Sequence, residues 1–166
     1  MTTDGQRSRV YDAEALVRRI FDRSVDYPIV DVAGSHLTLP PERKFASLES
    51  VQTYLDAVLA LRWVRQRWPR AAAPVFVRAR AGQSRAHYER FPGIIAVPLH
   101  HAGTAWALRE LVVLHELAHH LADEVDEIAH GSAFTGRMVE LVGGIVGDEA
   151  AFLLRVTLLE SGAAVG

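Results

Sequence analysis

The chain has 166 residues, of which 49% are hydrophobic and 23% are charged, and its formal net charge at pH 7 is −2. This composition is typical of a globular protein, and the length favours a single domain over two. The small net charge gives the molecule as a whole no general attraction to nucleic acid. Cysteine is absent, which excludes disulfides, thiolate catalysis and cysteine-based zinc sites, so any metal ion would be held by histidine and carboxylate side chains.

No apolar run approaches the roughly 18 residues that a membrane span requires, and Gly93–Leu99 is among the longest. The first residues are polar and lack the apolar centre of a secretory signal peptide. We therefore expect one cytoplasmic domain over residues 1–166 that contacts no membrane, with residues 1–10 flexible.

The first part of the chain predicts helices and a pair of short strands. In chain order, these are a helix over Tyr11–Ser24, strands over Tyr27–Val32 and Ser35–Leu39, and a long helix from Ser47 to about Arg67. Asp12 and Ser47 are the candidate N-caps of the two helices, and Pro69 is a stop signal after the second.

The middle of the chain predicts short strands, over Pro74–Arg80, Arg85–Arg90 and Ile94–Leu99. Gly82 and the Pro92–Gly93 pair mark the turns between them. Because these connections are short, they favour antiparallel hairpins over a doubly wound sheet.

Helices dominate the rest of the chain. We expect a helix from Thr104, as its cap, to about Asp123, and two more over Ser132–Val142 and Asp148–Glu160, separated by glycines at positions 143, 144 and 147. The first half of the helix from Thr104 is apolar nearly all round, which indicates that it is buried. The predicted fold class is therefore α+β, with a small, mainly antiparallel sheet packed on this central helix and other helices flanking it.

Residues 115–119 of the central helix read His-Glu-Leu-Ala-His, the HExxH arrangement. Residues four apart on a helix project from the same face, so His115 and His119 can bind one ion. Glu116 is displaced by about 100° around the helix, which places its carboxylate beside the ion, where it can accept a proton from a bound water. Zinc lowers the pKa of such a water to about 7 and polarises the carbonyl under attack. The motif therefore predicts a hydrolase with Zn²⁺ as cofactor and Glu116 as catalytic base; the alternative is an ordinary helix end with surface histidines.

A catalytic zinc site has three protein ligands and one open position for water. His130 is the best candidate for the third ligand, because it lies where the chain returns from the acidic loop that follows the central helix. Glu140, Glu149 and Asp123 are the alternatives.

The segments His115-Glu116-x-x-His119 and His130-Gly131-x-x-Phe134-x-x-x-Met138 together resemble the SprT-like group of zincin metallopeptidases. The chain is also similar to a family of short actinobacterial proteins described as metallohydrolases. The resemblance covers Thr104–Leu141 and implies a zincin-like fold, a peptide or protein substrate, His130 as third ligand and Glu116 as base. Members of the SprT-like group usually have a longer segment between the second and third histidines, and many carry a cysteine-bearing zinc module that is absent here.

Other parts of the site have more than one candidate residue. In zincins the strand before the active helix commonly pairs with substrate, and Ile94–Leu99 resembles that strand. An edge strand there would bind a peptide by strand addition, and the alternative is a plain core strand.

The sequence does not choose an oxyanion donor among Tyr88, His100, His101 and Arg137. Asp123, Asp126 or Glu127 could orient a ligand histidine. His120 follows the motif but lies one step around the helix, so we expect it to face Glu116 or solvent and not to bind the ion.

Arginine is concentrated between Arg62 and Arg90. The simpler interpretation is a solvated surface, and the alternative is a face that binds a polyanion.

The sequence as a whole leaves three hypotheses for the function: a zinc metallopeptidase, a regulatory peptidase domain associated with DNA or another partner, and a non-catalytic module with a structural zinc. The sequence leaves the substrate, the cleavage preference and the oligomeric state open.

Overall fold

The computed structural model describes residues 3–82, 85–100, 106–123 and 127–166. Its helices and strands are, in chain order, α1 (Arg7–Ser24), β1 (Ile29–Val32), β2 (Ser35–Thr38), α2 (Leu48–Ala60), α3 (Arg62–Arg67), the 3₁₀ helix η1 (Pro69–Ala72), β3 (Phe76–Ala79), β4 (His87–Glu89), β5 (Ile94–Val97), α4 (Glu110–His120), α5 (Ser132–Ile145) and α6 (Asp148–Glu160). The predicted α+β class is confirmed. Within the described ranges, no helix is both long and apolar enough to cross a membrane.

The chain forms two compact units. The first, here called the helical unit, comprises residues 1–42 and 126–166 and contains α1, the β1–β2 pair, α5 and α6. The second, here called the sheet unit, comprises residues 43–125 and contains the remaining elements.

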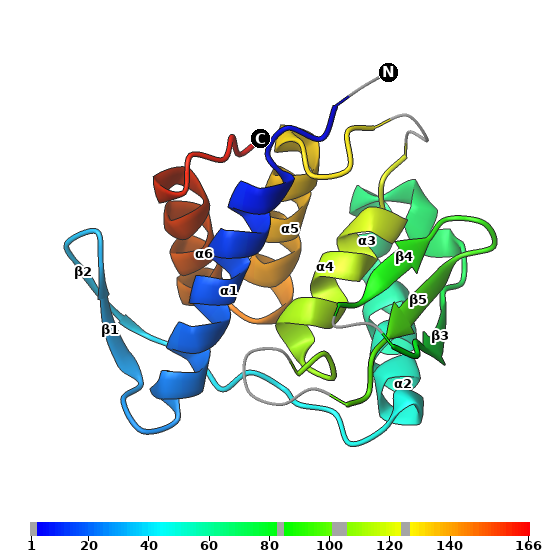
Figure 1. Cartoon of the computed structure of the whole chain (residues 1–166), viewed down its shortest axis with the longest axis horizontal. Helices are drawn as coiled ribbons and strands as arrows, with labels where there is room; N and C mark the ends of the chain where they lie inside the picture. The colour runs from blue at the N-terminus through cyan, green and yellow to red at the C-terminus, as the bar shows by residue number, and fades with distance from the viewer. Residues whose placement is uncertain (1–2, 83–84, 101–105, 124–126) are drawn as a thin grey trace. The chain divides into compact units, whose positions relative to one another are not determined.

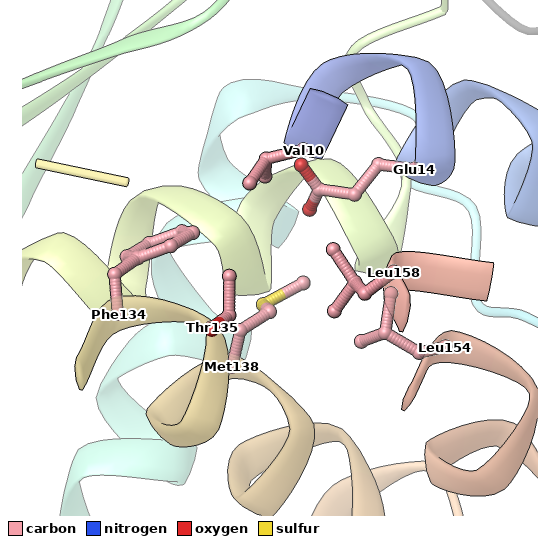
Figure 2. A pocket seen from close by; sticks show the side chains of 7 residues that line it. All are labelled: Val10, Glu14, Phe134, Thr135, Met138, Leu154 and Leu158. Atoms are coloured by element: carbon pink, nitrogen blue, oxygen red, sulfur yellow. The ribbon is translucent and has the colours of Figure 1, made fainter. Parts of the chain in front are cut away.

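The helical unit has a core formed by α1, α5 and α6, with α6 packed against both of the other helices (Figure 1). Figure 2 shows a pocket among them, lined by Val10, Glu14, Phe134, Thr135, Met138, Leu154 and Leu158. Helix α1 begins at Arg7, four residues before the predicted start, and Gln6 occupies its N-cap position in place of Asp12. The longer helix brings Val10, which is 1% exposed, into this core.

Strands β1 and β2 form an antiparallel hairpin in which Val32 pairs with Ser35. Its turn residues, Ala33 and Gly34, have φ angles of 49° and 82°, as the tightest hairpin turns require. Further along the helical unit, Gly143 and Gly144 lie inside α5 and do not separate two helices as expected. The break falls at Gly147, whose φ of 140° is incompatible with a continuing helix.

In the sheet unit the strand order is β3-β5-β4. Strand β5 pairs in parallel with β3 and antiparallel with β4, so the expected hairpin between the first two strands is wrong. Of the two interpretations of Ile94–Leu99, the core strand is confirmed and the edge strand is not, because β5 is central. Its residues Ile95, Ala96 and Val97 are fully buried, and such a continuous apolar run is stable only where both faces of the sheet are covered.

Ser47 is the N-cap of α2, as predicted, and forms a capping box with Ser50. The long helix expected to reach Arg67 is broken at Leu61, whose extended backbone separates α2 from α3. From α2, the Gln52 amide donates to the Val75 carbonyl at 2.8 Å and accepts from the Val77 N–H at 2.9 Å. This side chain therefore occupies the outer edge of β3 in place of another strand.

Helix α4 packs against β4 and β5 within the sheet unit (Figure 1). It begins at Glu110, so the predicted helix is too long at its N-terminal end; its expected cap, Thr104, is outside the described residues. Residues 107–109 do not join the helix, because Leu108 accepts a hydrogen bond from the Phe45 N–H at 2.8 Å and Arg109 forms a β-bridge with Lys44.

Candidate metal centre

The HExxH residues lie on α4 with both motif histidines turned the same way. The Nε2 atoms of His115 and His119 are 3.3 Å apart, and their ring centroids are 5.0 Å apart. Two imidazole nitrogens that bind a tetrahedral zinc ion at about 2.05 Å would be separated by about 3.3 Å. The pair therefore already has the spacing that two ligands of one ion need, as the helical periodicity predicts.

Glu116 lies beside this pair. Its Oε1 is 3.9 Å from the Nε2 of His115, and its side chain is 5% exposed. At this distance the Glu116 oxygen lies near the His115 Nε2 but does not form a hydrogen bond with it. A buried carboxylate in this position is suited to accept a proton from a water bound to an ion that the two rings would hold.

The N-terminal end of α4 is fixed by the carboxylate of Glu110, which is fully buried. Glu110 accepts hydrogen bonds from the Arg43 guanidinium at 2.8 Å, the Arg43 N–H at 3.3 Å and the Tyr54 hydroxyl. The bond to Glu110 raises the pKa of Arg43 above its ordinary value. A negative charge in the first turn also favours the helix dipole, so this contact both orients and stabilises the helix.

The C-terminal end of α4 is fixed by two arginines. Arg70 donates to the His120 carbonyl at 3.2 Å, while Arg90 donates to the carbonyls of Ala122 and Asp123 at 2.8 and 3.1 Å. The His120 carbonyl is one of the last in the helix, which have no partner within it, and a cation there complements the helix dipole. Arg90 holds the residues that directly follow α4. Arg70 and Arg90, two residues of the arginine-rich segment, are therefore used to hold the motif helix.

His120 is fully buried and does not face Glu116 or solvent, contrary to expectation. Its Nε2 donates to the Ala73 carbonyl at 2.9 Å, so its Nδ1, 2.7 Å from the Tyr88 hydroxyl, is the acceptor in the neutral ring. Burial lowers the pKa of His120, which favours this neutral form. With both ring nitrogens bonded to Tyr88 and Ala73, His120 is not available as a metal ligand.

The candidate oxyanion donors have different surroundings. The Tyr88 hydroxyl is engaged by His120 and accepts from Arg70 at 3.2 Å, and burial raises its pKa. Arg137, in the helical unit, makes a two-point ion pair with Glu127 at 2.6 and 3.2 Å. His100 is exposed, and His101 is outside the described residues. The structure therefore gives Tyr88 and Arg137 structural partners that the sequence did not indicate.

His130 lies in the helical unit, just before α5, and is 5% exposed. Its Nδ1 is 2.7 Å from the Oδ2 of Asp4, and its backbone carbonyl accepts from the Gln6 amide at 2.7 Å. The rings of Tyr11 and Phe134 each have centroids 5.1 Å from that of His130. The ring is therefore fixed by contacts from α1, from α5 and from the residues that precede α1.

Asp4 is a residue that the sequence analysis missed. The acidic side chains expected to orient a ligand histidine were Asp123, Asp126 and Glu127; Glu127 instead pairs with Arg137, and Asp126 is outside the described residues. Asp4 lies 126 positions before His130, so no local spacing could have linked them. The one sequence signal for this contact was that the N-terminal segment is polar and contains a carboxylate.

No protein-family model, curated protein or solved structure matches this chain.

Proposed function

We propose that this protein is a zinc-dependent hydrolase, and more specifically a metallopeptidase with a zincin-like fold, like those of the SprT-like group. In this proposal His115, His119 and His130 hold the ion, and Glu116 is the general base. Each of these histidines offers one imidazole nitrogen that can bind a metal ion. Three imidazoles and an open position are the composition of a catalytic zinc site.

The observation that carries the proposal is the 3.3 Å separation of the His115 and His119 Nε2 atoms beside the buried Glu116 carboxylate. His115 and Glu116 are buried and His119 is half-buried, so an ion bound there would be largely shielded from solvent. A divalent cation would be bound by both rings, and a water on that ion would lie beside the carboxylate. The rival ligands Asp123, Glu140 and Glu149 have exposed side chains, which favours His130.

When bound, zinc would polarise the substrate carbonyl and acidify the attacking water. The chain's own residues would then supply the proton transfers. Glu116 would take a proton from the water as it attacks the carbonyl carbon and deliver it to the leaving nitrogen when the C–N bond breaks. His120 keeps the end of α4 in place through Tyr88 and Ala73, and takes no part in these transfers.

The experiment compares wild type with Glu116→Gln and with the control Glu49→Gln, which changes an exposed glutamate in the first turn of α2. Zinc content is measured by mass spectrometry, and cleavage is followed with a fluorescently labelled, unfolded casein. We expect all three proteins to hold stoichiometric zinc, and Glu116→Gln alone to lose at least a hundredfold in rate, as removal of a general base does.

A fully active Glu116→Gln protein would refute the base assignment, and a wild-type protein that cannot hold zinc would refute the metal centre. Circular dichroism after chelation separates a catalytic from a structural ion. A structural zinc would unfold the protein on removal, whereas we expect the metal-free protein to keep its helices.

A further inference from the structure

Contacts from three neighbouring side chains hold the imidazole ring of His130 in place. Asp4 lies on one side of it through the 2.7 Å contact with Nδ1, and Tyr11 and Phe134 lie against the ring itself. Because a carboxylate only accepts hydrogen bonds, Nδ1 of His130 carries the proton in this contact. The remaining nitrogen, Nε2, is then the one with a lone pair for a metal ion.

The backbone of His130 is fixed by the same segment. The Gln6 amide donates to the His130 carbonyl at 2.7 Å and to the Ala164 carbonyl at 3.2 Å, and it accepts from the Ala164 N–H at 2.9 Å. Residues 4–6 thus hold both the ring and the main chain of His130, and Gln6 also ties this region to the chain that follows α6.

The second carboxylate oxygen of Asp4 gives an independent observation. Its Oδ1 is buried and has no hydrogen-bond partner among the described residues, although the side chain as a whole is 26% exposed. A buried carboxylate oxygen without a donor destabilises a protein unless a positive charge lies nearby. An imidazole whose other nitrogen binds a cation supplies such a charge through the ring.

We propose that Asp4 is a positioning residue of the metal centre, whose carboxylate holds the His130 ring with Nε2 presented for ligation. This inference rests on the proposed function and extends it: residues 4–6, before α1, belong to the zinc site. A carboxylate behind a ligand histidine fixes its tautomer and orientation and increases its basicity. Removal of Asp4 therefore weakens zinc binding although no ligand is lost.

The test measures zinc affinity by competition with a chromophoric chelator in four variants: Asp4→Asn, Asp4→Ala, His130→Ala and the control Asp12→Asn. Asp12 is an exposed carboxylate on α1, so its substitution removes the same charge elsewhere in the helical unit. We expect Asp4→Asn and Asp4→Ala to lower the affinity ten- to hundredfold, His130→Ala to lower it further, and Asp12→Asn to leave it unchanged.

A second measurement needs no metal. The nitrogen NMR shifts of His130 in the metal-free protein report its tautomer, and we expect a proton on Nδ1 in wild type and a mixed population in Asp4→Ala. If Asp4→Ala fails to fold, the nearly isosteric Asp4→Asn variant still tests the affinity. A merely structural role would lower the melting temperature and leave both the affinity and the tautomer unchanged.

The outcomes separate this inference from the proposed function. Wild-type affinity in both Asp4 variants, together with a loss in His130→Ala, would overturn the role of Asp4 and leave the ligand set intact. Wild-type affinity in His130→Ala would overturn the third ligand itself, and the role of Asp4 with it.

Discussion

The motif histidines and His130 are held in different ways. His115 and His119 share one helix, and the helix is fixed inside the sheet unit by a carboxylate at its start and by two arginines at its end. His130 precedes a helix of the other unit and depends on Asp4 and Gln6, more than a hundred positions away. A helix sets the spacing of two ligands from local sequence alone, whereas a single ligand outside a helix needs distant contacts to fix its ring.

The contacts that hold the two regions also differ in their expected contribution to stability. The contacts around α4 include a fully buried charge, and those around His130 are hydrogen bonds at a partly exposed segment. We therefore expect substitutions at the ends of α4 to reduce global stability more than substitutions in the N-terminal segment.

The largest effect is expected for Glu110→Ala. The substitution removes a buried carboxylate, its hydrogen bonds to Arg43 and Tyr54, and a favourable charge in the first turn of α4. Loss of a fully buried ion pair costs about 3–5 kcal/mol, and because the Arg43 side chain is 61% exposed and regains water, we expect about 3 kcal/mol here. Urea denaturation measures the change, and Glu49→Ala, an exposed first-turn glutamate of α2, is the matched control. Equal losses in the two variants would show that Glu110 acts only through helix propensity.

Arg90→Ala is expected to have the next largest effect, at the other end of the same helix. Arg90 donates to the carbonyls of Ala122 and Asp123, and hydrogen bonds from a charged group contribute about 1.5–3 kcal/mol. We expect a loss of roughly 2 kcal/mol, with faster hydrogen exchange in the last turn of α4. Arg85→Ala, an exposed arginine of the same segment, is the comparison variant. Unchanged exchange in α4 of Arg90→Ala would contradict the proposed anchoring.

Gln6→Ala tests the other region and is expected to have a smaller effect. The side chain makes three hydrogen bonds, to the backbone of His130 and Ala164, at a partly exposed position. Neutral hydrogen bonds contribute about 1 kcal/mol each at most sites, and exposure to water reduces this, so we expect about 1 kcal/mol in total. Exchange should increase at the start of α5 and remain unchanged in α4. A loss as large as that of Glu110→Ala would remove the energetic contrast between the two regions.

The same contrast explains which features could be predicted from the sequence. The common helix face of His115 and His119, the Ser47 cap and the positions of most helices depend on local spacing, and these predictions are confirmed. The pairing of β3 with β5 was not, because strand order depends on which strand is apolar enough to be central. The start of α4 was placed too early, since the backbone of residues 107–109 is held by Phe45 and Lys44 from a distant segment. Asp4 was missed for the same reason.

The smallest effect is expected at Glu89, on the exposed side of β4. Its carboxylate contacts His87 at 2.7 Å and the Arg78 guanidinium, and these two groups hold the pKa of Glu89 below its ordinary value of 4.5. A carboxyl whose pKa is lowered by folding stabilises the folded state above its unfolded pKa, and this contribution is lost as the pH falls through the lowered value. Carbon NMR titration should show the midpoint of Glu89 rising in His87→Gln and, to a lesser extent, in Arg78→Gln. At neutral pH, Glu89→Gln should leave stability within experimental error, because exposed ion pairs contribute little even at short distance. Glu89 and Glu110 each contact an arginine closely, so a large loss at Glu89 would show that proximity, and not burial, decides the strength of these contacts.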